Sequence, residues 1–404
     1  MSKTAQSFGA NGKRKVTSRA QKRAMKEYLK NVFSINTSYC RHEQETLAHV
    51  CELSGFVETT VGGNLYWFGL SLMDKDVKIV SKKKCYYNRF AGVEYLCRKK
   101  VFCAINNRMR RTFPKLFNFS PISFLVPEEA TALEAYMQEH PRFYFIGKPS
   151  RGRGGEGIIL ISKFADIPKN VFSMEEKDML VQRYIKTPLL LQNKKFDLRL
   201  YVLIKGYDPV EAYLCDEGLV RLCTENYKQP TPANMKNMFM HLTNFSLNKN
   251  NENFIAPEEN FMEKDEGSKR LLSTLWKQLE ENGVDVETVQ EKIKDTLRKA
   301  IITMEPYLIH SYHTKVSQDH ANTKNFQILG MDILIDKKLN AWLMEVNANP
   351  SLNMFIEKDM PPDSTEEPEK ILSELDKFVK TKVIAESVRI VTGQGTDEYD
   401  GCME

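Results

Sequence analysis

The segment from residue 326 to residue 352, FQILGMDILIDKKLNAWLMEVNANPSL, constrains the fold of this chain most strongly. Two apolar runs flank a short polar stretch, which predicts a β-hairpin with its loop over residues 337–340. Because side chains alternate faces along a strand, Glu345 and Asn347 point the same way, and this register places Asp332 directly opposite Glu345. Two carboxylates that face each other across a hairpin repel each other unless something neutralises them.

A hard divalent cation would remove this repulsion. Mg²⁺ binds carboxylate and other oxygen ligands, usually one or two protein carboxylates together with phosphate oxygens of a substrate. The hairpin therefore predicts a metal site formed by Asp332, Glu345 and Asn347. An amphipathic hairpin with one solvated face is the alternative, but the flanking Ile, Leu, Trp and Met residues indicate burial.

Length and charge set the broader limits. A chain of 404 residues is long enough for two or three domains with sizeable cores. Its net charge of +5 is unevenly distributed, since the first 30 residues hold nine Lys and Arg and one acid, Glu27. We expect this arm to be a solvated disordered tail, with a nucleic-acid arm or an anchor for an acidic polymer as alternatives. The sequence contains no secretory signal and no apolar stretch near 18 residues, so we expect no membrane partner.

The eight cysteines have no CxxC spacing, which favours reduced thiols over a structural zinc site. Strands are expected at 64–69, 76–81, 179–185 and 196–204, with a strand, loop and strand over 143–162. Helices are expected over 93–111, twice within 268–310, and after an acidic Pro-containing linker at 360–370. In the second of the paired helices Asp285 is the predicted N-cap, ahead of an apolar core stripe from Val286 to Leu308. Such a mixture indicates an α/β or α+β ligand-binding fold.

A glycine-rich loop, KPSRGRGGEG, spans residues 148–157 between two predicted strands. Its glycines allow close approach of the backbone to an anion, and Lys148, Arg151 and Arg153 add positive charge. The loop has neither a Walker A ending nor a GxGxxG pattern that opens onto a helix. A glycine-rich hairpin turn would explain the loop alone, whereas nucleotide phosphate is favoured once the metal hairpin is considered.

Charged residues also interrupt the apolar strand at 196–204. Lys195, Asp197 and Arg199 share one face of it, and Arg221 lies within a second apolar run. The strand VQRYI suits the backbone-mediated binding of an adenine edge, although from these residues alone an ordinary strand is the better explanation. We interpret His241 as a hydrogen-bonded core histidine rather than a metal ligand. No nucleophile stands out, and this inventory fits phosphoryl transfer by positioning and charge neutralisation.

The order and wording of these motifs resemble the tubulin-tyrosine-ligase-like family. The resemblance covers roughly residues 60–390 and is carried by segments such as IGKPSRGRGGEGI, KKFDLRLYVLI, FMHLTNFSLNK and LMEVNANPSL. The wording of FDLRLYVL, FMHLTN and EVNANPS is most similar to the polyglutamylase branch.

This resemblance implies an ATP-grasp fold of α+β or α/β class with small N-terminal, central and C-terminal domains. The expected division is a basic arm at 1–38, an N-terminal domain at 39–96, a central domain with the glycine-rich lid loop at 97–186, a C-terminal domain with the Mg²⁺ site at 187–392, and a polar tail at 393–404.

The resemblance also implies roles for individual residues. Two Mg²⁺ ions would be held by Asp332, Glu345 and Asn347, with Arg199 and Glu345 as the catalytic residues. ATP would be bound by Lys99, Lys148, Gly154, Gly155, Gln182, Arg183, Tyr184, Ile185, Lys195, Asp197, Thr243 and Asn244. L-glutamate would be bound by Arg221, Phe245, Lys269 and Lys380.

The implied reaction phosphorylates a glutamate side chain of an acidic tubulin tail, after which the amine of free L-glutamate attacks the acyl phosphate. The implied partners are tubulin or microtubules and free L-glutamate, with no nucleic acid, and we expect a monomer in the cytoplasm at the cytoskeleton, including the cilium or basal body. Basic surface would speed encounter with acidic tails, and the Lys/Arg-rich helix around 98–111 and the N-terminal arm are the expected contact.

Three positions depart from the family pattern. Gly154 stands where the lid loop usually has glutamine, Phe245 ends HLTNF where the family has HLTNY, and NRFAG replaces NHFPG at Arg89 and Ala91. These changes affect the positioning of acceptor and amino acid and leave the metal and phosphate residues intact. A glycine ligase, a ligase for a non-tubulin acceptor, and a microtubule-binding module without turnover are the alternative functions.

Overall fold

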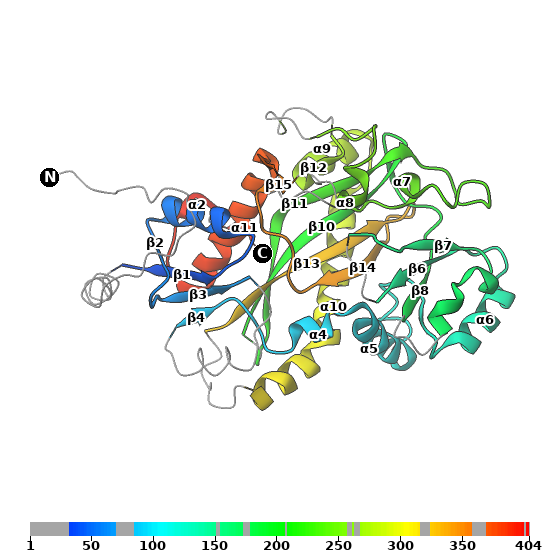
Figure 1. The fold of residues 1–404 in the computed structure, drawn as a ribbon, viewed down its shortest axis with the longest axis horizontal. Helices are drawn as coiled ribbons and strands as arrows, with labels where there is room; N and C mark the ends of the chain where they lie inside the picture. The colour runs from blue at the N-terminus through cyan, green and yellow to red at the C-terminus, as the bar shows by residue number, and fades with distance from the viewer. Residues whose placement is uncertain are drawn as a thin grey trace.

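The chain forms several sheets with helices packed around them in a computed structural model (Figure 1). The structure describes residues 32–69, 85–150, 154–172, 178–206, 208–256, 261, 267–315, 324–357, 369–399 and 401–403. Helices and strands are mixed along the chain, as the sequence predicts. No helix among these residues is both long and apolar enough to cross a membrane.

The first module is a parallel sheet with strand order β2-β1-β3-β4. Its elements are β1 (Ser34–Tyr39), α2 (Gln44–Ser54), β2 (Val57–Thr59), β3 (Leu65–Phe68) and β4 (Tyr86–Tyr87). The strand predicted at 64–69 is confirmed as β3, whereas the one predicted at 76–81 lies outside the described residues. Because β1 begins at Ser34 and is an interior strand, the folded chain starts before the expected end of the basic arm at residue 38.

The helix predicted over 93–111 is two helices, α4 (Val93–Leu96) and α5 (Lys99–Thr112). Arg98, between them, has φ −59° and ψ 132°, which is extended backbone and ends the helical hydrogen-bond pattern. An antiparallel sheet with order β5-β8-β6-β7 follows, confirming the strands predicted at 143–162 and 179–185. Its elements are β5 (Ser123–Val126), α6 (Ala130–Glu139), β6 (Phe145–Pro149), β7 (Ile159–Ile161), the 3₁₀ turns η1 (Phe164–Asp166) and η2 (Lys169–Phe172), and β8 (Met179–Arg183).

The largest sheet is antiparallel with order β12-β11-β10-β13-β14, and β9 pairs with β10. Its elements, with the short helices between them, are β9 (Leu190–Leu191), β10 (Lys194–Lys205), β11 (Glu211–Asn226), α7 (Met238–His241), α8 (Phe245–Asn248), β12 (Lys269–Leu271), β13 (Phe326–Ile335) and β14 (Ala341–Asn347). The predicted hairpin is present as β13 and β14, and Asp332 pairs with Glu345 as predicted. The loop predicted at 337–340 is wrong by one residue, because Ile335 pairs with Ala341, and an irregularity of the ladder between Asp332 and Ile333 restores the predicted register at Asp332.

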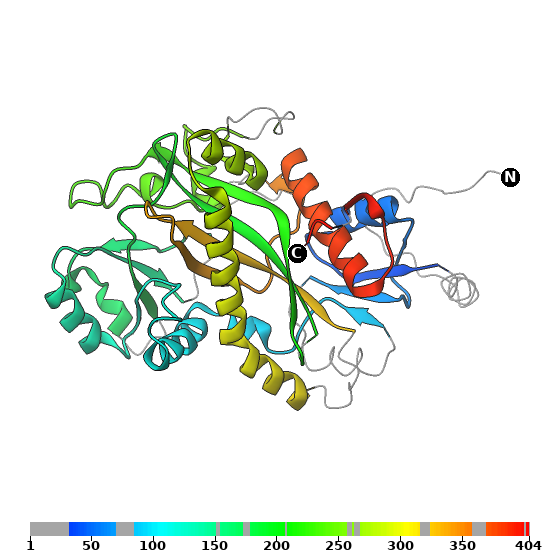
Figure 2. The same ribbon diagram turned by 180° about the vertical axis from the view of Figure 1, so that it is seen from behind.

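Two helices cover one face of this sheet, α9 (Leu272–Glu281) and α10 (Val286–Lys315), and Figure 2 shows α10 crossing its strands. Asp285 caps α10 as predicted, since its carboxylate accepts a hydrogen bond from the backbone N–H of Thr288 at 3.0 Å. The predicted stripe on α10 is buried against β10 and β13, except that Ile301 is only partly buried. On β10 the even-numbered residues from Phe196 to Ile204 face this core.

The other face of the sheet is divided. At one end Tyr201 and Leu203 of β10 pack in a core with the first module and with α11 (Glu374–Thr392). At the other end the same face of β10 carries Lys195, Asp197 and Arg199, of which Arg199 lines the cavity described below. A change of side-chain chemistry along one strand face therefore separates an apolar core from a group of charged residues.

The helix predicted after the linker is confirmed as α11, which follows the pair β15 (Phe355–Glu357) and β16 (Lys370–Leu372). Ser373 caps its first turn and Gly393, at φ 67°, ends it. The chain then forms η3 (Asp397–Tyr399), and Cys402 and Met403 are buried beside β11 through a bridge between Cys215 and Met403. The segment expected to be a polar tail at 393–404 therefore includes two residues of the core.

Candidate active site

Charged residues form a row across the open end of the large sheet. The register pairs Arg221 of β11 with Asp197 of β10, Arg199 of β10 with Asp332 of β13, and Asp332 with Glu345 of β14. Paired residues of an antiparallel sheet point to the same face, so these side chains lie next to one another on the face away from α10. The carboxylates of Asp332 and Glu345 therefore do lie side by side, and the neighbouring strands place Arg199 and Arg221 close to Asp332.

Asp332 is held by two arginines. Arg199 donates from Nε to Oδ1 at 2.6 Å and from Nη2 to Oδ2 at 3.1 Å, and Arg221 Nη2 lies 2.9 Å from Oδ2. Arg221 also donates two hydrogen bonds to Asp197, at 2.8 and 2.6 Å. Burial alone would raise the pKa of Asp332, but the charges of Arg199 and Arg221 hold it well below its usual range. Asp332 is therefore ionised and paired with both arginines before any ligand binds.

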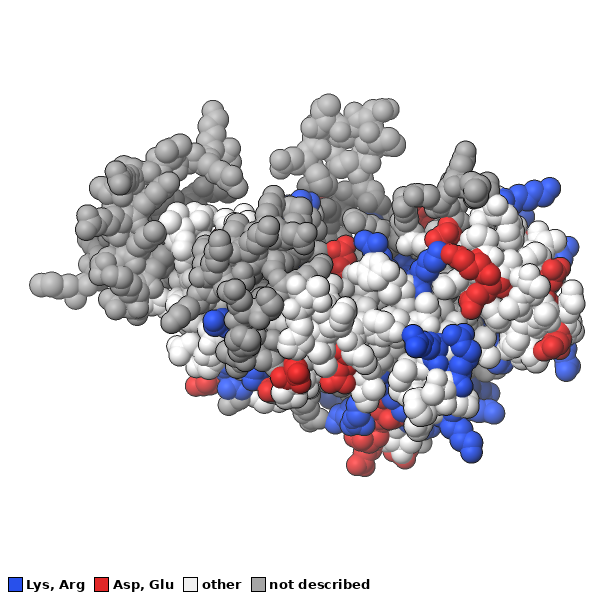
Figure 3. All heavy atoms as spheres, turned by 90° about the horizontal axis from the view of Figure 1, so that it is seen from below, with Lys and Arg blue, Asp and Glu red and all other residues white. Residues whose placement is uncertain are grey.

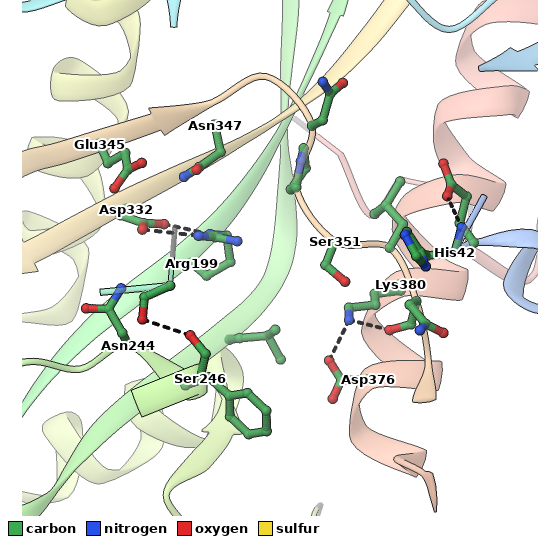
Figure 4. A pocket seen from close by; sticks show the side chains of 18 of the residues that line it. His42, Arg199, Asn244, Ser246, Asp332, Glu345, Asn347, Ser351, Asp376 and Lys380 are labelled. Carbon is green, nitrogen blue, oxygen red and sulfur yellow. Dashed lines mark hydrogen bonds and ion pairs between the residues drawn. The ribbon is translucent and has the colours of Figure 1, made fainter. Parts of the chain in front are cut away.

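Glu345 and Asn347 complete the predicted metal set, and Figure 4 shows them beside Asp332 and Arg199. Glu345 Oε1 lies 3.2 Å from Lys99 Nζ, at the start of α5. Asn347 Nδ2 lies 3.4 Å from the carbonyl oxygen of Gly330, which leaves its side-chain oxygen as the group for a ligand. Two carboxylates and an amide oxygen on one face are donors suited to Mg²⁺, so these residues fit the ion that the sequence predicts.

The glycine-rich loop meets the segment HLTNF. Ser246 donates a hydrogen bond to the carbonyl oxygen of Gly154 at 2.9 Å, and Gly155 approaches Asn244. Both glycines have positive φ, 61° and 95°, and a Cβ at Gly154 would contact Ser246 too closely. The usual family glutamine would therefore not fit at 154 without displacing Ser246. Arg151 and Arg153 lie outside the described residues.

Lys148 lies in β6, one residue before its end, and is buried beside the metal set. Its Nζ donates to Gln182 Oε1 at 2.9 Å and lies 3.5 Å from the carbonyl oxygen of Met344, next to Glu345. Burial lowers the pKa of Lys148, and the charge of Glu345 opposes that shift. Lys148 therefore links the β5-β8-β6-β7 sheet, which we call the central sheet, to the β13-β14 hairpin, at the place where phosphate is expected.

A second group of charges forms the far wall of the site. Lys269 Nζ lies 2.5 Å from Asp376 Oδ2, and Lys380 Nζ lies 2.9 Å from Asp376 Oδ1. Lys269 also lies over the ring of Phe245, 4.7 Å from its centroid. Burial would raise the pKa of Asp376, but the two lysines hold it well below its usual range, and burial lowers the pKa of Lys269 to about 8.

These groups surround one cavity of about 1210 Å³. The predicted site residues that line it are Lys99, Lys148, Gly154, Gly155, Arg199, Arg221, Asn244, Phe245, Lys269, Asp332, Glu345, Asn347 and Lys380. Residues from each of the three modules contribute, which explains why the set is scattered along the chain. A cavity of this size can hold more than one small molecule at a time.

The other predicted residues, Gln182, Arg183, Tyr184, Ile185, Lys195, Asp197 and Thr243, do not line this cavity. Arg183 points to the opposite face of β8 from Gln182, since its guanidinium carbon lies 3.9 Å from the ring centroid of Phe143. Lys195 donates to the Tyr184 hydroxyl at 3.1 Å and to the carbonyl oxygen of His241 at 2.7 Å. Adenine binding by this group stays a prediction.

His241 is a core histidine, as the sequence indicates. It is fully buried, and its Nδ1 lies 3.1 Å from the Tyr184 hydroxyl. Burial and the nearby charge of Lys195 lower the pKa of His241 to about 4, so the ring is neutral at pH 7. All eight cysteines are free thiols.

Sequence reasoning missed several residues of the site. Asp376 lies four residues before Lys380 on one helix, so the i,i+4 spacing could have revealed it. Arg41, His42 and Arg89 of the first module also line the cavity, and no local pattern marks the first two. Glu43 orients this wall, since it accepts hydrogen bonds from Trp67 Nε1 at 3.2 Å and from the His42 backbone at 3.0 Å.

The sequence of this chain is similar to those of known proteins. A sequence profile of the Tubulin-tyrosine ligase family matches residues 78–361. The chain is 35% identical over 320 residues to "Tubulin polyglutamylase ttll6" of Danio rerio, a match that covers 78% of this chain and 39% of that protein. It is 36% identical over 334 residues to "Tubulin polyglutamylase TTLL11" of Homo sapiens, covering 81% of this chain and 45% of that protein.

A third relative is "Tubulin polyglutamylase ttll-11" of Caenorhabditis elegans, 32% identical over 380 residues, with 91% of this chain and 53% of that protein covered. The chain thus spans about half the length of these relatives or less. The predicted family resemblance is confirmed by the profile match and by relatives that are named for the polyglutamylase activity.

Proposed function

The chain belongs to the tubulin-tyrosine ligase family, and from that premise we propose that it is an ATP- and Mg²⁺-dependent ligase for L-glutamate. Its acceptor is a glutamate side chain in an acidic protein tail, and the C-terminal tails of tubulin are the proposed acceptor. The observation that carries this proposal is the single cavity in which oxygen donors for a metal face two clusters of buried cations.

The proposed fold is an ATP-grasp arrangement in which the central sheet and the large sheet enclose ATP. Lys148 and the loop at Gly154 and Gly155 come from the central sheet, and Asn244 and Asp332 come from the C-terminal part of the chain. Backbone N–H groups of the glycine loop and the ammonium of Lys148 suit the phosphates of ATP. The division into three domains belongs to this proposal, with the first domain beginning by Ser34 and with Cys402 and Met403 counted in the fold.

Asp332, Glu345 and Asn347 would hold Mg²⁺, and we propose two ions because two carboxylates face each other there. Bound Mg²⁺ supplies neutralisation of phosphate charge and alignment of the phosphoryl group. Arg199 lies beside these donors and stabilises negative charge on the transferred phosphoryl group. The side chain of Asp332 fixes the direction of Arg199, which lowers the cost of reorganisation during the reaction.

The reaction proceeds in two steps. The acceptor carboxylate attacks the γ-phosphorus of ATP, the bond to the bridging oxygen breaks, and ADP leaves. The amine of L-glutamate then attacks the carbonyl carbon of the acyl phosphate, inorganic phosphate leaves, and the amine gives up its proton as the isopeptide bond forms. Neither step needs a protein nucleophile, and the residues that line the cavity act by positioning the reactants and by stabilising charge.

The lysine-rich wall favours glutamate over glycine as the incoming amino acid. L-glutamate carries two carboxylates, and Arg221, Lys269 and Lys380 offer three cations. The ring of Phe245 holds Lys269 from one side, so replacement of the family tyrosine keeps this contact and removes only a hydroxyl. A glycine ligase would need one cation for its single carboxylate.

Incubation of the full chain with ATP, Mg²⁺, tubulin and labelled glutamate or glycine tests the proposal. We expect glutamate to be incorporated, and tubulin without its C-terminal tails to remain unlabelled. Incorporation of glycine alone would indicate a glycine ligase. Incorporation of neither amino acid, with co-sedimentation with microtubules retained, would indicate a binding module. If an acidic protein other than tubulin is the better acceptor, the proposed acceptor is wrong but the proposed reaction still holds.

A further inference from the structure

The C-terminal end of α5 and the turn after it carry exposed basic and apolar side chains together. Between Glu94 and Glu128 the chain has seven Lys and Arg residues and no Asp or Glu. Residues 111–116 are all exposed, and the large apolar side chains of Phe113 and Leu116 keep 47% and 55% of their surface in solvent. We name Arg108, Arg111, Phe113, Lys115 and Leu116 the α5 patch.

The backbone beneath the α5 patch is fixed. Arg110 donates from Nε to the carbonyl oxygen of Phe117 at 3.1 Å, and from Nη2 to the carbonyl oxygen of Ser120. The ring of Phe117 is buried and lies 6.1 Å from the ring of Phe113. The backbone N–H of Phe117 also donates to the carbonyl oxygen of Phe113 at 3.0 Å. A partner would therefore meet a preorganised surface and pay little to order it.

The charges of the α5 patch differ from those nearer the cavity on the same helix. Lys99 pairs with Glu345, and Lys100 pairs with Asp178 at 2.7 Å. In the part of the chain that the structure describes, none of the recorded ion pairs involves Arg108, Arg111 or Lys115. Figure 3 looks from below onto the side where Figure 1 places α5, and shows Lys and Arg side chains gathered there. This surface is available to carboxylates of another molecule.

The position of the α5 patch relates it to the cavity. Lys99 at the first residue of α5 lines the cavity, and α5 has 14 residues. At a rise of about 1.5 Å per residue the helix places its last residue about 20 Å from its first. Roughly six residues of extended polypeptide span that distance. A flexible tail of ordinary length can thus reach the cavity from a protein body bound at the α5 patch.

We propose that the α5 patch binds an acidic surface on the folded body of the acceptor protein, while the acidic tail of that protein enters the cavity. This inference rests on the proposed function, and it adds a second contact outside the cavity. A tail of glutamates would leave Phe113 and Leu116 without apolar partners, so the partner surface must combine carboxylates with apolar groups. Exposed aromatic and arginine side chains on a rigid base are typical of protein contact surfaces.

The test compares two acceptors, intact tubulin and a synthetic peptide with the sequence of its acidic tail. Two variants remove the two properties of the α5 patch, Arg108→Glu with Arg111→Glu, and Phe113→Ser with Leu116→Ser. We expect each variant to raise KM for intact tubulin about 10-fold, a typical effect for contact residues of this kind. KM for the peptide and kcat for both acceptors should remain within about two-fold.

The control is Lys169→Glu with Phe172→Ser, since η2 also exposes a lysine and a large aromatic side chain. It should leave KM for both acceptors unchanged. Equal effects of the α5 variants on tubulin and peptide, or no effect on either, would overturn the proposal. Loss of binding to phosphatidylserine vesicles with an unchanged KM for tubulin would assign the α5 patch to lipid instead.

Direct binding separates this proposal from the proposed function. Co-sedimentation with microtubules whose C-terminal tails have been removed should persist for the wild-type chain and weaken about 10-fold for the α5 variants. Such a result supports the α5 patch even if no amino acid is incorporated. Equal co-sedimentation of wild type and variants would overturn the α5 patch while leaving the ligase activity intact.

Discussion

Two buried aspartates each hold a pair of cations in the cavity, and the two arrangements differ in the kind of cation. Asp332 lies between Arg199 and Arg221, whereas Asp376 lies between Lys269 and Lys380. Arginine keeps its charge throughout the pH range in which proteins are folded, but burial lowers the pKa of Lys269 to about 8. One side of the cavity therefore has a fixed charge, and the other has a charge that depends on pH.

Loss of the carboxylate should be more costly on the arginine side. Asp332→Asn leaves Arg199 buried without its carboxylate and leaves Arg221 with Asp197 alone, and it should destabilise the fold by about 3–5 kcal/mol. Asp376→Asn should cost less, because Lys269 can lose its proton and become neutral. Urea unfolding of both variants at pH 7 measures the difference. A larger loss for Asp376→Asn would contradict the distinction between the two pairs.

The pH dependence of the two losses sharpens this prediction. In Asp376→Asn a protonated lysine is destabilising, so raising the pH from 7 to 9 removes its proton and should reduce the loss. The loss in Asp332→Asn should stay constant over that range, since the arginines do not titrate. In the wild-type chain both depressed carboxyl pKa values have the opposite consequence at low pH. Their stabilisation is present above a pH of about 4 and is lost as the pH falls toward the pKa of the folded state.

Substitution of Glu345 should lower the catalytic rate with little effect on the stability of the fold. Glu345→Gln should lower kcat by about 10²–10³-fold, the usual effect of removing one electrostatic group of a transition state. The free energy of unfolding should change by less than about 1 kcal/mol, because its ion pair with Lys99 is partly exposed. Glu128→Gln, which removes a partner of Lys100 away from the cavity, is the matched control for both assays. Retained activity in Glu345→Gln would remove this residue from the metal set.

Lys269 should make the binding of L-glutamate depend on pH. Between pH 7 and pH 9 we expect KM for L-glutamate to rise several-fold as Lys269 loses its charge. Lys195 also has a pKa lowered to about 8 by burial, so KM for ATP is measured in parallel. Lys269→Arg should abolish the rise for glutamate and leave any rise for ATP in place. A rise that persists for glutamate in this variant would assign it to another group.

The smallest expected effect is at Phe245. Its contact with Lys269 is a cation–π interaction worth about 0.5–2 kcal/mol, so Phe245→Leu should raise KM for glutamate by about three-fold or more. Phe245→Tyr keeps the ring and should behave as wild type. Equal KM values for Phe245→Leu and wild type would show that the ring does not support the lysine side.

The metal hairpin could be predicted from the sequence because strand alternation and a short turn fix its register. The pairing of Asp332 with Glu345 agrees with those two rules, although a shift of register between Asp332 and Ile333, which the rules do not predict, is also needed to produce it. The cap at Asp285 and the core stripe of α10 could also be predicted from the sequence, since both depend on local spacing. What these elements share is that near neighbours in the sequence determine them.

Other parts of the site depend on tertiary packing and could not be predicted. Arg41 and His42 reach the cavity only because the first module packs against the large sheet. The break between α4 and α5 depends on one extended residue, Arg98, in a sequence that is otherwise favourable for a helix. The burial of Cys402 and Met403 likewise requires a bridge to β11, far away in the sequence.

The packing of α11 has a consequence for how the chain folds. Its apolar face forms a core with Ile35 and Leu47 of the first module, and Thr46 donates to the carbonyl oxygen of Leu352, 306 residues along the chain. Contacts of such long sequence separation form slowly, because a long loop must close first. The first module therefore leaves the ribosome with an uncovered apolar surface and must wait for α11 to be synthesised. Chaperones that bind exposed apolar segments would meet the nascent chain during that interval.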